Sequence, residues 1–332
     1  GKSKMLLSDG GSPKYSSTGH LLFSRHSTVF AVPFDLGKLE VKGQPVAIMD
    51  GLLIANAWAN GFFDIKNNGT IVFAPGGYTG KDRRMVILDA EGRATEWSSE
   101  RLPFEIGVWA TSDGSRAASV VANAAGIYEI WASERGGSAS RRLAAKEGVD
   151  CFIPCWTEDG RTVAYSQVSQ TEDDGVYVMS LDRARASRRI AKFPLGTQGF
   201  PTSWTTDGSR LLVTRVEAGT KFKIVSVPAS STDGAEPEPL FEGEPGNHAN
   251  AFLWPDNRLV GYQSDESGQV QNYVRAWDGT GPVGEGIPIG RTTRFGWLMW
   301  SRDGRKVRFV DQVGKCVQVE ILTQPRLAAS PP

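Results

Sequence analysis

Residues 156–165 read WTEDGRTVAY, and this stretch decides the fold of the chain. Trp156 ends a short strand, Asp159 and Gly160 make a tight turn, and an apolar strand leaves the turn. Glycine supplies the positive φ that a two-residue hairpin turn requires, and the preceding aspartate tolerates the turn and forms hydrogen bonds within it. The stretch therefore predicts a β-hairpin.

The same hairpin recurs through the whole chain. Close copies are residues 110–114 (ATSDG), 204–208 (WTTDG) and 300–304 (WSRDG), and degenerate copies are 15–19 (YSSTG), 65–69 (IKNNG) and 253–257 (LWPDN). Every copy has an apolar residue three positions after its final residue. These residues are Leu22, Val72, Ala117, Val163, Leu211, Val260 and Val307.

The spacing of the copies predicts the architecture. Successive turns are 45 to 50 residues apart, and a period in the forties with strand-like content is typical of propeller blades, each a four-stranded sheet. We predict an all-β chain that forms a seven-bladed β-propeller as a single domain over residues 1–324, with a tail at 325–332. The blades are expected near residues 14–50, 60–98, 104–145, 152–192, 200–242, 250–289 and 295–322.

We expect a strand from the N-terminus to complete the last blade. Residues 295–322 provide three strands, whereas residues 4–8 form a surplus strand before the first repeat. Because an unpaired edge strand invites aggregation, we predict that residues 4–8 complete the last blade. We also predict that the aromatic residues that end the first strands, Trp156, Trp204 and Trp300, are buried between adjacent blades.

Composition excludes several classes of partner. Lys and Arg number 37 against 37 Asp and Glu, so no basic footprint indicates nucleic acid. No apolar run approaches the roughly 18 residues of a membrane span. We expect a monomer.

The three cysteines are not expected to form a disulfide. Cys151 and Cys155 are about 13 Å apart along one predicted strand, too far for a disulfide, and Cys316 is distant from both in the sequence. Three buried or half-buried thiols are expected.

Several stretches resemble a known family. They are residues 19–23 (GHLLF), 29–35 (VFAVPFD) with 43–46 (GQPV), 68–73 (NGTIVF), 262–268 (YQSDESG) with 273–275 (YVR), and 300–305 (WSRDGR). The repeat resembles that of TolB-type, WD-like β-propellers, and these stretches resemble the propeller domains attached C-terminally to bacterial serine/threonine protein kinases. The resemblance covers about the whole chain in order.

The resemblance implies the fold more than the function, because these motifs are structural. The His-Arg-Asp and Asp-Phe-Gly motifs of a kinase and its Gly-rich loop of the pattern Gly-x-Gly-x-x-Gly-x-Val are absent from the sequence. In a kinase, this chain would be the non-catalytic portion, and a free-standing propeller fits the sequence equally well. The resemblance favours an extracytoplasmic or periplasmic location and leaves a cytoplasmic one open.

The starts of the innermost strands carry the candidate ligand site. In a propeller these starts surround one mouth of the central channel, and a ligand site needs a few oriented polar groups on an apolar floor. Alternatively, the aromatic residues pack between blades and the polar groups cap strand ends. The predicted ligand-binding residues are Asn60, Glu105, Asp150, Gln198, His248 and Arg294.

Metal and cofactor sites are not predicted. The aspartates of the repeated turns are expected to stabilise the turns rather than bind metal. The acidic loops at 172–175 (EDDG) and 265–268 (DESG) lack the spaced ligands of a calcium loop. The three histidines, His20, His26 and His248, are scattered along the sequence.

Two functions follow from these observations. The first is a non-catalytic module that binds a protein, peptide or small polar ligand at one propeller face, possessing no catalytic group of its own. The alternative is a propeller-fold enzyme of the lyase or cyclase type, which would use His248, Glu105, Asp150 and Arg294 at the channel mouth. A Gly-x-Ser-x-Gly motif is absent, which excludes an appended hydrolase domain of that type.

Overall fold

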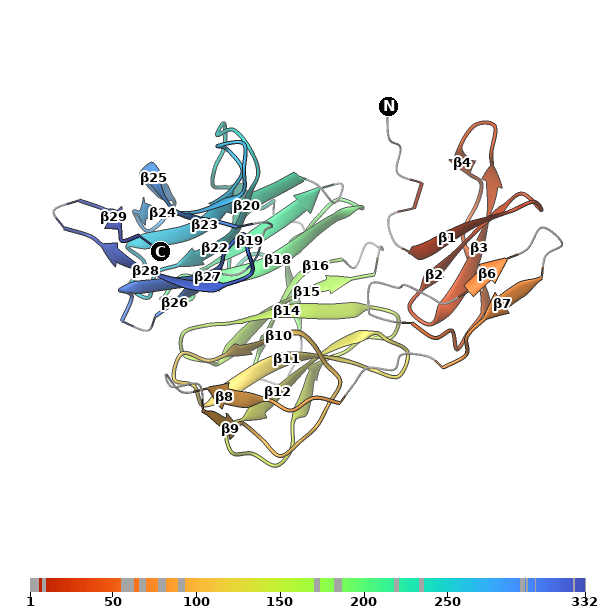
Figure 1. Cartoon of the computed structure of the whole chain (residues 1–332), viewed down its shortest axis with the longest axis horizontal. Coiled ribbons are helices and arrows are strands. Elements are labelled where there is room, and N and C mark those ends of the chain that lie inside the picture. The colour runs from red at the N-terminus through yellow and green to blue at the C-terminus, as the bar shows by residue number, and fades with distance from the viewer. Residues whose placement is uncertain are drawn as a thin grey trace. The chain divides into compact units, whose positions relative to one another are not determined.

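The computed structural model of the chain describes residues 6–7, 10–54, 63–65, 70–76, 82–88, 93–169, 174–181, 187–217, 221–232, 236–292, 296, 298–301, 303–324 and 326–331. These residues form strands and turns without any helix (Figure 1). The all-β prediction is therefore confirmed. The chain divides into two compact units, residues 1–108 with 117–152 and residues 109–116 with 153–332, and each is described by itself.

The first unit begins with a five-stranded sheet. Its order is β1-β2-β3-β4, and β5 also pairs with β3. The bounds are β1 Gly11–Ser16, β2 His20–Arg25, β3 Thr28–Asp35, β4 Glu40–Val41 and β5 Val46–Met49.

The second predicted blade, at residues 60–98, differs from the prediction. Its described residues form two separate two-stranded sheets instead of one four-stranded sheet. Each strand is three residues long and forms few ladder hydrogen bonds, and Val72 and Phe73 are exposed. Seven four-stranded blades are therefore not confirmed. The strands are β6 Phe63–Ile65, β7 Ile71–Phe73, β8 Val86–Leu88 and β9 Ala94–Glu96.

The remaining five sheets, over residues 104–329, share one organisation. Each has four strands in sequence order, and neighbouring strands such as β15 and β16 or β23 and β24 pair antiparallel. The sheet β10–β13 belongs to the first unit except for its hairpin at 109–116, and the following sheets lie chiefly in the second unit. The bounds are β10 Phe104–Ala110, β11 Arg116–Ala122, β12 Tyr128–Glu134, β13 Arg141–Ala144; β14 Asp150–Trp156, β15 Thr162–Val168, β16 Gly175–Ser180, β17 Arg188–Lys192; β18 Thr197–Trp204, β19 Arg210–Glu217, β20 Lys221–Pro228, β21 Glu238–Pro239; β22 His248–Leu253, β23 Leu259–Ser264, β24 Gln271–Trp277, β25 Pro282–Arg291; and β26 Met299–Trp300, β27 Lys306–Val310, β28 Cys316–Leu322 and β29 Ala328–Ala329.

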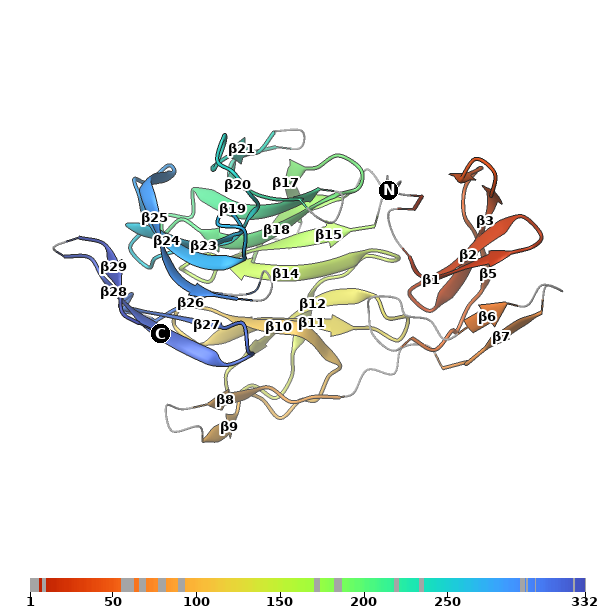
Figure 2. The ribbon, with the colours of Figure 1, turned by 45° about the horizontal axis from the view of Figure 1, so that its top comes forward.

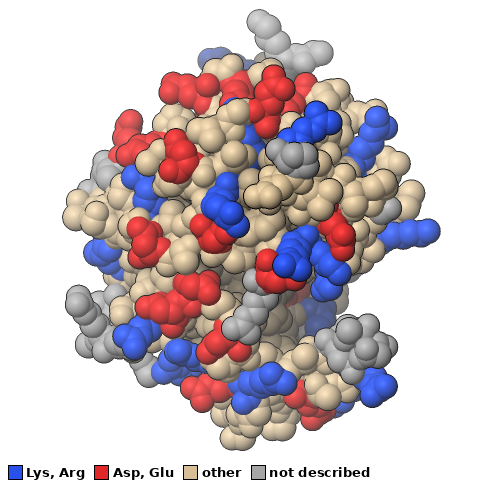
Figure 3. Space-filling view, turned by 90° about the vertical axis from the view of Figure 1, so that its left-hand side faces the viewer, with Lys and Arg blue, Asp and Glu red and all other residues tan. Residues whose placement is uncertain are grey.

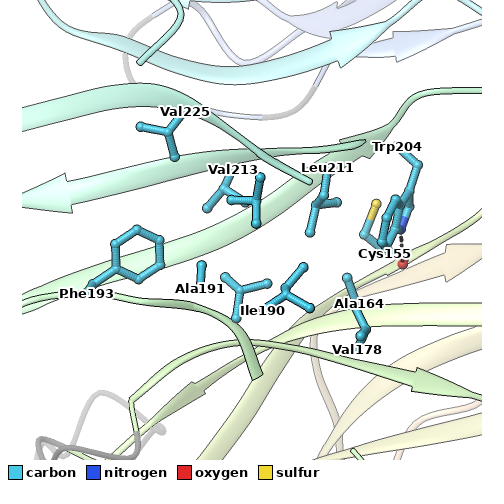
Figure 4. Close-up of a cluster of buried hydrophobic side chains, with 12 residues drawn as sticks. Cys155, Ala164, Val178, Ile190, Ala191, Phe193, Trp204, Leu211, Val213 and Val225 are labelled. Atoms are coloured by element: carbon cyan, nitrogen blue, oxygen red, sulfur yellow. Dashed lines mark hydrogen bonds between the residues drawn. The ribbon is translucent and has the colours of Figure 1, made fainter. Parts of the chain in front are cut away.

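In the second unit, consecutive sheets pack face to face. Strand β15 contacts β18, and β19 contacts β22, as the succession of labels in Figures 1 and 2 shows. Apolar side chains fill the layer between β14–β17 and β18–β21. Figure 4 shows Ala164, Val178 and Ile190 on one side of this layer and Leu211 and Val213 on the other. Because both faces of a middle sheet are covered, strands such as β23 are buried at every residue rather than at alternate ones.

The repeated turns are held by one hydrogen-bond pattern. The Thr157 hydroxyl donates to Asp159 Oδ1 at 2.6 Å, and the same oxygen accepts from the Arg161 amide at 3.0 Å. Gly160 has a φ of +62°, the conformation that favours glycine. The pairs Thr111–Asp113, Thr205–Asp207 and Ser301–Asp303 repeat the hydroxyl bond at 2.5–2.6 Å. These four aspartates thus stabilise turns, as the sequence predicted.

The tryptophans that end the first strands tie one sheet to the next. The indole Nε1 of Trp156 donates to the Trp109 carbonyl at 2.9 Å, and that of Trp204 donates to the Cys155 carbonyl at 3.1 Å. Trp300 donates in the same way to the Phe252 carbonyl at 3.0 Å. Trp156 and Trp204 are buried, which confirms the prediction for them, whereas Trp300 is half-buried.

The three cysteines are free, as expected. Cys151 and Cys155 are buried, and burial raises the pKa of each thiol to about 12. Cys316 is exposed, which corrects the expectation of three buried or half-buried thiols.

The C-terminal tail supplies the fourth strand of the last sheet, where the sequence predicted residues 4–8. Strand β29 pairs with β28 through Ile321 opposite Ala329 and Leu322 opposite Ala328. The edge of β28 that residues 4–8 were predicted to cover is therefore paired with residues 328–329. Leu6 and Leu7 belong to no strand, while residues 4, 5 and 8 lie outside the described residues. A strand that follows β28 directly closes a short loop, which costs less entropy than recruiting a strand from the other end of the chain.

Candidate binding site

The predicted channel-mouth residues are distributed over both units. Glu105 and Asp150 belong to the first unit, and Gln198 and His248 to the second. Asn60 and Arg294 lie outside the described residues. The ring of six therefore stays a prediction.

In the first unit, Asp150 has a structural role that favours the strand-capping alternative. Its Oδ1 accepts a hydrogen bond of 2.8 Å from the amide of Tyr128, the first residue of β12. Its Oδ2 lies 3.9 Å from Nε2 of His26. Glu105 is second in β10, and its carboxylate lies 3.3 Å from Nη1 of Arg83. Both carboxylates are thus engaged within the first unit.

In the second unit, Gln198 and His248 have different environments. Gln198 is half-buried in β18, opposite Val216 of β19. His248, the first residue of β22, is 3% exposed. Its ring stacks on Phe241 with centroids 4.6 Å apart and planes 16° apart, and it packs more obliquely on Tyr262 at 5.9 Å. Such a buried side chain does not present itself at an open mouth.

Two carboxylates face the His248 imidazole. Nε2 lies 3.4 Å from Glu266 Oε2 and 4.0 Å from Glu244 Oε2. Burial lowers the pKa of His248 below its ordinary value, outweighing the carboxylates, which act to raise it. This shift favours the neutral form of the imidazole. Burial likewise raises the pKa of the neighbouring Tyr262 phenol above its ordinary value, so that group is also neutral.

Arg275 completes this group of side chains. Its Nη1 donates to Glu244 Oε1 at 2.8 Å and to Oε2 at 3.0 Å. The guanidinium lies 5.8 Å from the centre of the Phe241 ring, a distance that suits a cation–π contact. Glu244 therefore lies between a guanidinium and a neutral imidazole.

An open pocket of about 580 Å³ lies at the other ends of the first strands in the second unit. Its volume is within the range of small-ligand sites. Five tryptophans contribute to its walls, and Trp254 and Trp300 contact each other with ring centroids 4.8 Å apart. Among the described lining residues, Glu158 is the one charged side chain, and it is exposed. The lining includes Trp109, Trp156, Trp204, Trp254 and Trp300, with Ser112, Thr157, Thr205, Thr206, Asn257 and Ser301 between them.

The sequence contained a signal for this pocket. The tryptophans occur at nearly constant positions just before the repeated turn. In most copies, a residue with a hydroxyl or amide side chain follows the tryptophan within two positions. From the sequence, only a packing role was predicted for Trp156, Trp204 and Trp300. Because the indoles of Trp156 and Trp204 donate hydrogen bonds to the preceding sheet and both residues also line the pocket, the same residues serve both purposes.

Charge is mixed on the face of the molecule that Figure 3 shows. On the face in Figure 3, acidic and basic side chains are interspersed without one broad region of a single sign. This agrees with the balance of 37 basic and 37 acidic residues. Within the described residues, no helix is long and apolar enough to cross a membrane.

Comparisons with known proteins support the fold. No family model matches the chain, and no curated protein matches it. TolB from Acinetobacter baumannii is 14% identical over 96% of this chain and 78% of its own, with a TM-score of 0.57. A TolB candidate from Agrobacterium tumefaciens is 17% identical over 72% of this chain and 82% of its own, with a TM-score of 0.53.

Peptidase propellers are also similar in structure. Prolyl oligopeptidase B from Galerina marginata is 12% identical over 97% of this chain, with a TM-score of 0.52, and the chain spans half of its length. At these identities the likeness concerns the fold and not the activity. The repeated four-stranded sheets, the turn motif and these neighbours together show that the chain has a TolB-like β-propeller fold.

Proposed function

We propose that this chain is a non-catalytic binding propeller that holds a protein or peptide segment in the tryptophan-lined pocket of its second unit. The observation that supports the proposal is the pocket itself, in which the ends of successive first strands present indoles beside hydroxyl groups. Tryptophan offers a large apolar surface at a low cost in side-chain entropy, which makes it frequent where binding energy is concentrated.

The lining also limits the chemistry of the bound segment. Glu158 gives the rim a negative charge, and indole faces attract cations. A segment with an apolar side chain next to Lys or Arg fits these features better than an acidic one. The resemblance to kinase-attached propellers extends the proposal: in a kinase, this chain would be the interaction portion.

The test is a selection of peptides from a random library on the purified protein, followed by affinity measurements on variants. Glu158→Lys reverses the rim charge, and Thr206→Trp places a bulky side chain at an exposed lining position. Glu236→Lys is the matched control, because Glu236 is exposed in the same unit and is not among the lining residues. Both pocket variants should weaken binding at least tenfold while the control does not. Equal affinity in all four proteins would refute the pocket as the site.

The predicted ring of Asn60, Glu105, Asp150, Gln198, His248 and Arg294 is a second proposed surface, and it rests on repeat position. The double variant Glu105→Ala and Arg294→Ala tests it. Loss of a selected partner with an unchanged melting temperature would support the ring. Retention of every partner would assign these residues to the structure of the sheets.

A further inference from the structure

The buried histidine of the second unit lies in a donor set that metals use. One ligand atom from each of Glu244, His248 and Glu266 can be chosen so that all three lie within 4.8 Å of one another. The register of β22 and β23 produces this arrangement: His248 is paired with Ser264, and Glu266 follows Ser264 by two residues. None of the three side chains lines the tryptophan pocket.

His248 Nε2 points into this set without a satisfactory partner. The side chain is 4% exposed, and Nε2 is a buried atom that forms no hydrogen bond. His248 Nε2 and Glu266 Oε2 are therefore close, at 3.4 Å, without forming a well-directed hydrogen bond. Buried polar atoms nearly always have a partner. Stacking on Phe241 fixes the plane of the ring, so Nε2 keeps this direction.

The side chains around His248 include more acidic groups than basic ones. Glu244, Glu266 and the adjacent Asp265 carry three negative charges, and Arg275 contributes one positive charge. Asp265 is held by Asn247, whose amide nitrogens donate to its two oxygens at 2.6 and 2.8 Å. The Ser264 hydroxyl lies 3.3 Å from Glu266 Oε2. Arg275 contacts Glu244 through Nη1, and the carboxylate oxygens retain lone pairs for a cation.

We propose that Glu244, His248 and Glu266 bind one divalent transition-metal ion, with Zn²⁺ as the best fit. An imidazole nitrogen with two carboxylates suits Zn²⁺, whereas Ca²⁺ and Mg²⁺ favour all-oxygen sites. At metal–ligand distances of about 2.0 Å, tetrahedral ligands are about 3.3 Å apart. The two carboxylates, 33% and 25% exposed, would move inward toward His248. Three protein ligands leave a fourth position for water or another donor.

Zinc titration of the chelator-treated full chain tests the site. Calorimetry with ZnCl₂ should give one equivalent bound, and Co²⁺ should produce visible absorption bands of a nitrogen- and oxygen-ligated ion. Glu266→Gln keeps the size of the side chain and should weaken binding at least tenfold, as should His248→Gln. Glu242→Gln and His20→Gln are the controls. Glu242 is exposed in the segment before β22, and His20 lies outside the proposed set.

The outcomes separate the site from two alternatives. Selective weakening by Glu266→Gln, with an unchanged circular dichroism spectrum, supports the site even where His248→Gln fails to fold. Absence of binding by the parent protein would show that the group is only an ion-pair network around Arg275. Equal binding by the parent and Glu266→Gln would assign the metal to adventitious surface groups. Either result overturns the proposal.

Discussion

The indole nitrogen of Trp156 donates a hydrogen bond of 2.9 Å to the carbonyl oxygen of Trp109, which lies in the preceding repeat. Trp204 and Cys155, and Trp300 and Phe252, repeat this relationship. Each bond joins the ends of two neighbouring first strands. The tryptophan positions therefore set how adjacent sheets meet in the second unit and, at the same time, shape the pocket between the strand ends.

Replacing Trp204 by Ala should destabilise the second unit strongly. The side chain is 7% exposed and packs with Cys155, Ala164 and Leu211, so the change removes buried apolar surface and leaves a cavity, at a cost of about 3–5 kcal/mol. Trp204→Phe should cost less, because it loses the hydrogen bond but keeps most of the packing. Urea unfolding would measure both. A cost near zero for Trp204→Ala would contradict the packing described.

Removal of a turn hydroxyl should lower the stability of the folded protein far more than a change at a neighbouring residue. Thr205 Oγ1 donates to Asp207 and accepts from the Arg210 amide at 3.0 Å. Thr205→Val removes these bonds and should cost about 1–3 kcal/mol, the usual range for leaving a polar group unpaired. Thr206→Val is the matched control, since Thr206 is the next residue and is exposed. Similar melting temperatures for the two variants would refute the role of the hydroxyl.

Acid should destabilise the protein partly through these turns. The Thr111 hydroxyl, followed by the Ser115 amide, lowers the pKa of Asp113 to about 2 from 3.8, and similar bonds lower the pKa of Asp159, Asp207 and Asp303. A depressed carboxyl pKa stabilises the folded state above pH 4, and this contribution is lost as the pH falls toward 2.

The Asp113→Asn variant isolates one such contribution. Its stability relative to the parent, measured by urea unfolding, should be lower at pH 5 than at pH 2.5, because the parent loses the advantage of its charged carboxylate in acid. A difference between the two proteins that does not change with pH would contradict the assignment.

Removing the C-terminal tail should expose an aggregation-prone edge. Strand β29 covers β28, and unpaired edges invite strand addition. A chain ending at residue 324 should therefore melt earlier and form oligomers in light scattering. A chain lacking residues 1–8 is the comparison. If that chain aggregates and the first stays monomeric, the N-terminal strand completes the sheet after all.

The sequence predicted what depends on local patterns. The hairpins, the turn aspartates and the burial of Trp156 and Trp204 all follow from residues close together in the chain. The pairing of Ala328 with Leu322 could not be foreseen, because a two-residue strand has no periodicity. The approach of Glu266 to His248 depends on the register of β22 with β23, which spacing does not specify. The sequence predicted His248 at an open channel mouth, whereas the structure buries its side chain, because burial depends on the packing of Phe241 and Tyr262 around it.

The most direct test of the binding proposal is the response of the tryptophan indole N–H resonances to a selected peptide. In ¹⁵N-tryptophan-labelled protein, we expect the signals of the tryptophans that line the pocket to shift on titration. These residues are Trp109, Trp156, Trp204, Trp254 and Trp300. Trp97, Trp131 and Trp277 are not among the lining residues and should keep their positions. A peptide that binds while shifting only the second group would contradict the account.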